Sequence, residues 1–539
     1  MFGDFRYLLV WCCALLTVGA VNVPVLITER RRMTNEEAIQ LTSDLFGTDD
    51  YSFTVSDERV YVESADRLKH LEYDTVSGGI TAADDSEPWS PAAGPPGNLP
   101  SEPQAMEMAI EITKRLNILP ADGLLPAEIE LIIKSDRTSG TYVAHEYSDG
   151  AGGYIREDYL IDVSAFFDIS IKVPDYPEPL LLTGGGGKFK VAFGSNCRLK
   201  EFQALWRPIV GSKPYEIMPQ EEADRLYQQS LGALAGTATN ITSFLAYYSE
   251  PFGTLQKLMY PMYVYEGNAV VGDESIPIRP QATRGGDGTG SSHPGMKQFP
   301  KRQALDDAKL FEAASEWLGE PYGLTLAKRN ADGFRNGVQD TAPLGVYRYE
   351  KSNKDVLESD FVSEADTWAD TVDMLFYTGH ANRNGWMVAE PGTGAEMFID
   401  YRSFGAGPEV PGDLLGQQDL EWLIIAACGP HQDQHINPSD GNVFDRWRGI
   451  FDGLHIMFGY ATASVDSSEE GGRFMKYAQE GDTLINAWFR AAKELQTSEV
   501  IVSAMWTDDA WDDHLPGYGC VSSDNTLGSQ ERWIMWTTC

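Results

Sequence analysis

Two short stretches of sequence decide the fold of this chain. Residues 372–380 read VDMLFYTGH and residues 420–428 read LEWLIIAAC. Each is an almost continuous apolar run that ends at a reactive side chain, His380 in the first and Cys428 in the second. Runs of this kind are typical of central strands in a parallel sheet covered on both faces. We therefore predict an α/β fold here, with both strands inside one parallel sheet.

The two reactive side chains should meet, because the carboxyl ends of parallel strands converge on one crevice. A histidine beside a cysteine can form the thiolate–imidazolium pair of a cysteine hydrolase. We predict that His380 deprotonates the thiol of Cys428, which then attacks a carbonyl carbon at a surface-facing site. Backbone N–H groups at Gly379, Ala381 and Gly429 are the candidate oxyanion donors. The alternative is structural, since a lone buried cysteine is often an inert core residue.

The surroundings of the pair resemble a known group of enzymes. Cys428 follows His380 by 48 residues, and the run Ala427-Cys428-Gly429 fits the middle of the caspase signature. A further apolar strand over 454–461, a polar turn with Ser464 and Asp466, and helices over 469–479 and 485–495 follow.

In this order, residues 304–539 resemble the caspase–hemoglobinase clan of cysteine peptidases: caspases, legumains, gingipains, separases and CHAT domains. They are also similar to a large uncharacterised secreted family with Y-T-G-H and A-A-C-G-P motifs. The resemblance implies a caspase-like parallel sheet with flanking helices, and peptidase-like chemistry.

The overall charge excludes some classes of partner. The 539 residues carry a formal net charge of −38, which repels nucleic-acid backbones and anionic membranes. The glycine run before Lys188 lacks the spacing and the Ser/Thr of an ATP-type phosphate loop. We predict a peptide or small amide as substrate, with no nucleic acid and no stable membrane insertion.

The first residues predict export. In residues 1–20 Arg6 precedes an apolar run and small residues stand at 18–20, which is the pattern of a signal peptide. The alternative is a membrane anchor that reaches Ile27 and stops at Arg30. We expect a secreted protein or one in the lumen of the secretory pathway.

In an oxidising secretory compartment, two of the remaining cysteines are expected to form a disulfide and one asparagine to be glycosylated. Cys520 and Cys539 form the expected disulfide, which would tie down the C-terminal region. Asn240 lies in the glycosylation sequon Asn-Ile-Thr.

Composition divides the rest of the chain. Residues 34–86 predict a small α+β module similar to the PepSY modules of secreted peptidase propeptides, and residues 87–103 a proline-rich linker. A β-rich module with helices should follow over 104–280, and a glycine-rich basic linker over 281–303. The caspase-like domain then spans 304–539. Helices are expected over 35–46, 104–116, 220–231, 306–317 and 364–369, and strands over 51–55, 59–62, 71–73, 129–133, 141–145, 159–163, 169–173, 188–193 and 201–206.

The basic linker contains Lys301-Arg302, a dibasic pair of the kind that processing proteases cut. The N-terminal modules could then be an intramolecular inhibitor of a zymogen, held close by the linker until it is cut. The competing interpretations are an ordinary basic linker, and modules that are permanent structure sharing a core with the last domain.

Two further polar clusters are candidates. His431 and His435 have a spacing that binds a metal when it lies on a helix, but the flanking prolines predict a loop here. We therefore predict no metal and no cofactor. An acidic cluster near the C-terminus, with Trp386 from a loop, could select basic side chains as gingipain-like pockets do, or could be a solvated loop. Its members are Asp508, Asp509, Asp512 and Asp513.

The function expected from these features is a secreted cysteine peptidase-like hydrolase with N-terminal modules that restrain it. Two alternatives remain open. One is an inactive caspase-like binding or scaffold protein, because a fold does not fix a function. The other is an acyl hydrolase, transferase or cyclase that uses the same dyad on a small metabolite.

Overall fold

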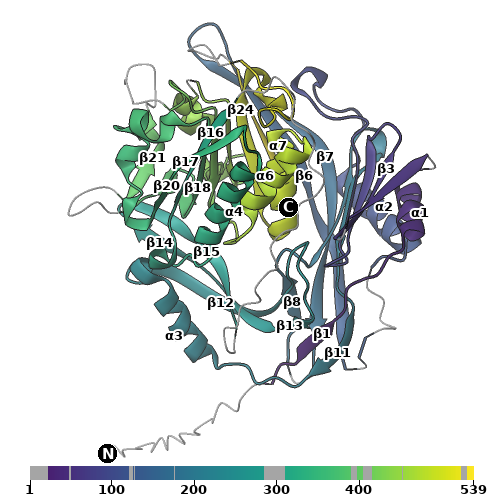
Figure 1. The fold of residues 1–539 in the computed structure, drawn as a ribbon. Coiled ribbons are helices and arrows are strands. Elements are labelled where there is room, and N and C mark those ends of the chain that lie inside the picture. Colours follow the sequence, from purple (N-terminus) through teal and green to yellow (C-terminus); the bar gives the residue numbers. More distant parts are fainter. Residues whose placement is uncertain are drawn as a thin grey trace, which may run out of the picture.

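The structure is a computed structural model of the whole chain. It describes residues 22–539 except 48–49, 57, 120–124, 127, 175, 285–309, 390–396, 405–414, 452 and 524–530. The protein is a mixed α/β structure, rich in strands, with few helices and large sheets (Figure 1). Within the described residues, no helix is long and apolar enough to cross a membrane.

The N-terminal part is one helix packed on an antiparallel meander. The helix α1 (Asn35–Phe46) begins at a capping box made by Thr34 and Glu37. It packs on strands that pair in the order β2-β3-β4-β5, and β5 continues onto β10 (Leu199–Leu205). The strands are β2 (Tyr51–Val55), β3 (Arg59–Ser64), β4 (Lys69–Asp74) and β5 (Ile80–Asp84).

The middle part is built on two long strands. β6 (Glu130–Ser148) and β7 (Tyr154–Lys172) form a hairpin, and α2 (Glu102–Arg115) packs against it. The sheet divides at β7, which pairs with β9 (Lys188–Phe193) at one place and with β8 (Leu180–Thr183) at another. The β8 branch continues through β12 (Ala238–Tyr248), β14 (Pro261–Val271) and β15 (Glu274–Arg284), with α3 (Gln220–Ser230) packed on β14. A separate small sheet has the order β11-β1-β13, from β11 (Ile209–Lys213), β1 (Val25–Thr28) and β13 (Leu258–Met259).

The C-terminal part contains the parallel strands. They pair in the order β17-β16-β18-β22-β23, and every neighbouring pair in this set is parallel. β24 and β25 then add in antiparallel pairing. The strands are β16 (Phe311–Trp317), β17 (Gly345–Ser352), β18 (Met374–Thr378), β22 (Trp422–Ala426), β23 (Ile456–Tyr460), β24 (Ile501–Thr507) and β25 (Glu531–Thr538).

Three helices cover one face of this sheet. α4 (Ala327–Asp340) packs beside α6 (Glu470–Glu480), and α6 packs beside α7 (Leu484–Leu495) (Figure 1). Their buried faces join Phe376, Ile424 and Phe458 of the central strands in one apolar cluster. The opposite face is covered by α5 (Val443–Trp447), by the three-stranded sheet β19 (Ala381–Asn382), β20 (Gly385–Met387) and β21 (Phe398–Asp400), and by the middle part of the chain.

The middle and C-terminal parts form one continuous structure. β25 pairs with β6 over six residues, from Glu531 opposite Tyr147 to Trp536 opposite Tyr142. Ala144 of β6 and Tyr227 of α3 also belong to the same apolar cluster as the parallel strands.

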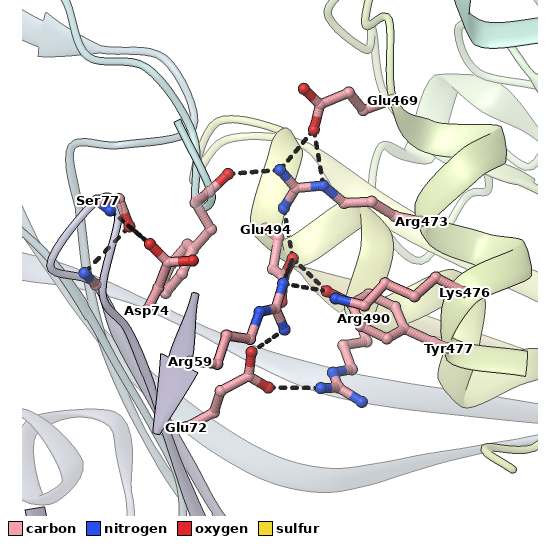
Figure 2. A network of polar contacts seen from close by, with 12 residues as sticks. Arg59, Glu72, Asp74, Ser77, Glu469, Arg473, Lys476, Tyr477, Arg490 and Glu494 are labelled. Atoms are coloured by element: carbon pink, nitrogen blue, oxygen red, sulfur yellow. Dashed lines mark hydrogen bonds and ion pairs between the residues drawn. The ribbon is translucent and has the colours of Figure 1, made fainter. Parts of the chain in front are cut away.

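A buried ionic network joins the N-terminal meander to α6 and α7 (Figure 2). Glu72 of β4 accepts hydrogen bonds from Arg59 of β3 and, at 2.6 Å, from Arg490 of α7. Glu494 of α7 accepts from Arg473 and from the hydroxyl of Tyr477, both on α6 and both at 2.5 Å. Since these side chains are largely withdrawn from water, removal of one partner leaves the buried charges around it less fully compensated.

Several expected elements differ from the structure. The helix expected over 306–317 is wrong, because Phe311–Trp317 is the strand β16, in parallel pairing on both sides. The helix expected over 364–369 is a pair of short 3-10 turns. The four strands expected between 129 and 173 merge into β6 and β7, and the expected proline-rich linker over 87–103 already contains the start of α2. In the alternative of a membrane anchor reaching Ile27, the last residues differ from a helix, since Val25–Thr28 is the strand β1; residues 1–21 lie outside the described residues.

Candidate functional site

The parallel sheet brings the two reactive residues to the same edge. In the pairing of β18 with β22, Thr378 lies opposite Ala426. His380 comes two residues after Thr378, and Cys428 comes two residues after Ala426. The prediction that they follow adjacent parallel strands is therefore confirmed, and their backbones leave the sheet in matching positions.

The thiol of Cys428 lies against the loop that follows the next strand, β23. The backbone N–H of Ser464 points at the sulfur at 3.3 Å, and the Ser464 carbonyl oxygen lies 3.6 Å from it. An N–H donor stabilises a thiolate, and a carbonyl accepts from a thiol. The Ser464 backbone can therefore interact favourably with either protonation state of Cys428.

The imidazole of His380 is oriented by the loop after β16. Its Nε2 lies 2.8 Å from the carbonyl oxygen of Tyr322. A carbonyl oxygen only accepts hydrogen bonds, so Nε2 carries the proton and Nδ1 carries the lone pair in the neutral ring. This tautomer leaves Nδ1 as the basic atom, which is the form that a general base requires.

Both side chains are buried. Cys428 is 0% exposed and His380 is 1% exposed. The expectation of a surface-facing thiol is therefore wrong: the Ser464 loop after β23 lies against Cys428, and the middle part of the chain packs against the residues after His380. The side chain of Asn382, just after His380, donates to Glu274 and to the carbonyl of Ser275 on β15, at 2.9 and 3.0 Å.

The same cover reaches the loop that holds His380. Gly232, which follows α3, has no space for a side chain, because an added Cβ would lie 2.4 Å from the carbonyl oxygen of Pro321. Pro321 is the residue before Tyr322. The α3 region therefore presses on the loop whose carbonyl orients the imidazole.

The candidate oxyanion residues have restricted backbones. A Cβ on Gly379 would lie 2.0 Å from the hydroxyl of Tyr377, which itself donates to the carbonyl of Met387 at 2.6 Å. Gly429 has a φ of +69°, a conformation that glycine adopts without strain. Ala381 is paired with Trp386 in the hairpin β19–β20. These three positions are fixed by local geometry, and their role as donors remains a prediction.

The acidic cluster near the C-terminus is not beside the dyad, which corrects the expectation that Asp508, Asp509, Asp512 and Asp513 line the substrate pocket. β24 runs antiparallel to the other strands, so its carboxyl end reaches the amino edge of the sheet, where Trp506 lies opposite Ile456. Asp513 accepts from the indole of Trp422, at the start of β22, at 3.0 Å and lies 2.8 Å from His455.

Trp386 is also not a pocket residue. It is fully buried and stacks on Trp447 and Phe404, with ring centroids 5.9 and 5.5 Å away. The hairpin β19–β20 carries it into the core that covers one face of the parallel sheet. The loop expected at this place is therefore ordered by an aromatic cluster.

The two histidines after Cys428 have separate structural partners. His431 is buried with Nδ1 3.0 Å from the hydroxyl of Ser503, and burial lowers its pKa to about 3, with a further contribution from Arg446. His435 stacks on Trp536, and its ring meets Tyr142 edge-on. Among the residues that the structure describes, no group of three or more acidic, histidine or cysteine side chains is arranged to hold a metal ion.

The expected disulfide is absent. Cys520 is exposed beyond the 3-10 turn that follows β24, whereas Cys539 is buried at the end of β25, and neither is bonded to another cysteine. Asn240 is exposed at a bulge of β12, as an acceptor for a glycan must be. The expected signal peptide over 1–20 and the Lys301-Arg302 pair lie outside the described residues.

One contributor to the site was missed by sequence reasoning. Tyr322 acts through its backbone, which leaves no trace in the residue type, and the preceding segment was assigned to a helix rather than to β16. The turn with Ser464 and Asp466 was identified. Asp466 accepts from the backbone N–H of Leu326 at 3.0 Å and so joins the β23 loop to the start of α4.

Comparison with known proteins gives one match to a family model, in the C-terminal part. Residues 311–538 match a family model described as "Domain of unknown function (DUF6345)", and this match runs from the start of β16 to the end of β25. No curated protein sequence matches the chain. One solved structure with some similarity is an uncharacterized protein from Eubacterium rectale ATCC 33656. It has a TM-score of 0.28 and 10% identity, over 49% of this chain and 84% of that one.

Proposed function

We propose that the chain is a cysteine-dependent hydrolase of peptide or amide bonds, built on a caspase-like sheet and acting through His380 and Cys428. The matching positions of these residues at the ends of neighbouring parallel strands carry the proposal. Two further contacts support it: the N–H of Ser464 directed at the sulfur, and the carbonyl of Tyr322 that sets the tautomer of His380.

The chemistry assigns one task to each group. His380 takes the thiol proton, and the sulfur of Cys428 adds to the substrate carbonyl, whose oxygen becomes the oxyanion. The backbone N–H groups of Gly379, Ala381 and Gly429 are the proposed donors to that oxygen. His380 then returns the proton to the leaving amine, and water hydrolyses the thioester to release the acid and regenerate the thiol.

Burial of the dyad gives the N-terminal modules a role in this proposal. The segment from α3 to β15 lies across the edge of the sheet where substrate must enter. We propose that these modules are an intramolecular cover that restrains the hydrolase. Local movement of this cover, with the Tyr322 loop, opens the site.

Burial also favours a second candidate, an inactive binding or scaffold protein on the same fold. Both candidates predict a stable fold, but only the hydrolase predicts turnover. A library of short peptides should be incubated with the exported protein and with the Cys428→Ala and His380→Ala variants. The hydrolase proposal expects cleavage that both substitutions remove. Cleavage that persists in Cys428→Ala assigns the chemistry to other residues, and the absence of cleavage with all three proteins supports the scaffold.

A further inference from the structure

A cavity lies directly behind the loop that contacts Cys428. Its volume is ≈ 300 Å³, and it opens between the middle part of the chain and the C-terminal part. Ala463 and Val465 line it, while Ser464, between them, faces the sulfur of Cys428. A group bound in this cavity would therefore be one loop thickness away from the thiol.

The walls of the cavity are mostly apolar. Side chains of β8, β12 and β14 supply one wall, and the turn before β24 supplies the other. Phe244, at the opening, is 38% exposed. A hydrocarbon chain is the kind of group that such walls bind, because its burial removes apolar surface from water. The principal apolar lining residues are Leu181, Phe244, Tyr248, Val264, Ile278 and Val500.

Two carboxylates stand at the rim of this apolar cavity. Glu266 and Glu499 both line it, and both are exposed to solvent. Neither forms an ion pair with any residue that the structure describes. Partial desolvation raises the pKa of Glu499; Arg137 opposes this shift, whereas Asp168 and Glu266 add to it.

The nearby cation does not neutralise the rim. Arg137 binds both carboxylate oxygens of Asp168, at 3.2 and 2.8 Å, and also the carbonyl and hydroxyl oxygens of Ser498. Its charge is therefore committed to Asp168, and the rim keeps an excess of negative charge at Glu266 and Glu499. The charge and shape together fit a ligand with an apolar stem and a cationic head.

We infer that this cavity binds a lysine or arginine side chain of a peptide. The aliphatic stem lies along the apolar walls, and the ammonium or guanidinium group lies between Glu266 and Glu499. The role of this side chain as part of a substrate rests on the proposed function, whereas its binding does not.

Binding should be measured without turnover, in a Cys428→Ala background. The probe is a short acetylated and amidated fluorescent peptide with a single lysine, and its partner carries norleucine, which keeps the stem and removes the charge. Fluorescence anisotropy at low salt should show tighter binding of the lysine probe. The Glu266→Gln/Glu499→Gln double variant should bind the lysine probe about tenfold more weakly and the norleucine probe unchanged.

The matched control is Asp273→Asn, which removes one negative charge from the turn of the same β14–β15 hairpin, outside the cavity lining. It should leave both probes unaffected. Added salt should weaken the binding of the lysine probe and leave that of the norleucine probe unchanged. This comparison needs no substitution of Glu266 or Glu499. Equal affinity of the two probes, or an equal loss in Asp273→Asn, would overturn the inference. Probe binding and turnover test the two proposals separately. If the cavity does not bind the lysine probe, Cys428 can still be the nucleophile. If Cys428 is inactive, the cavity can still bind the probe.

Discussion

Substitution of Glu494 by glutamine tests the ionic network that joins α6 and α7 to the N-terminal meander. Burial alone raises the pKa of this carboxyl group, but the charges of Arg59, Arg473, Arg490 and Lys476 outweigh that effect and hold the pKa at about 2. An unfolded glutamate has the ordinary value of 4.5. Because the pKa is lower in the folded state, the charged form stabilises folding above the ordinary value, and this stabilisation is lost as the pH falls toward 2.

The size of the effect follows from the two pKa values. The difference between these two pKa values corresponds to roughly 3 kcal/mol at pH 7, and about half of that remains at pH 3. Glutamine keeps the shape of the side chain but removes one of the two buried carboxylates that each of Arg473 and Arg59 contacts, so that only Glu469 and Glu72 remain as their partners. Glu494→Gln should therefore lower the free energy of unfolding by about 3 kcal/mol at neutral pH and by about half as much at pH 3.

Urea unfolding of the wild type and of Glu494→Gln, at pH 7 and at pH 3, measures this difference in the free energy of unfolding. The transition to follow is the one in which α6 and α7 unfold. Glu480→Gln is the matched control, because Glu480 is on the same helix as Arg473 but is partly exposed in its pairing with Arg490. Its cost should stay below about 1 kcal/mol. A Glu494→Gln effect as small as that of the control, or one that grows toward acid pH, would show that the charge of Glu494 does not stabilise the fold.

Three further outcomes follow from the structure. A protease site inserted within 285–303 and then cut should leave two fragments that elute together from a sizing column, because the β25–β6 pairing and the shared core hold them together. Separation of the fragments would show that the N-terminal modules are a releasable cover. Asp513→Asn should lower the melting temperature, since it weakens the contacts to Trp422 and His455. It should leave the reactivity of Cys428 unchanged, and a loss of that reactivity would show that the acidic cluster contributes to the site. Cys428→Ala should cost about 1 kcal/mol of stability, measured by urea unfolding, because the sulfur is fully buried; no cost would indicate a thiol that faces solvent.

The central strands could be predicted because their signal is local. The runs ending at His380 and Cys428 are apolar at almost every position, which is what burial on both faces of a parallel sheet requires. Their neighbour β16 was missed for the opposite reason. Phe311–Trp317 contains alanine and glutamate residues that favour helices, and only its pairing with β17 and β18, which is long-range, makes it a strand.

Features that depend on strand direction or on contacts between distant segments could not be predicted from the sequence. The sequence does not give the direction of β24. Because this strand is antiparallel to its neighbours, the acidic cluster that follows it lies at the other edge of the sheet from the dyad. An oxidising compartment favours a disulfide between Cys520 and Cys539, yet one thiol is buried and the other exposed. The cover over the dyad arises from contacts such as that between Asn382 and Glu274, more than a hundred residues apart, which no local pattern records.

If His380 activates the thiol of Cys428, the pH dependence of alkylation at this cysteine must show it. Among the described residues, Cys197 and Cys520 are the cysteines that are at least partly exposed, so both are first replaced by serine. The rate of iodoacetamide modification of Cys428 should then be followed by mass spectrometry. We expect the midpoint of this pH dependence to lie clearly below the ordinary cysteine pKa of about 8.5, and to return toward that value in His380→Ala. The same midpoint in both proteins would contradict the dyad.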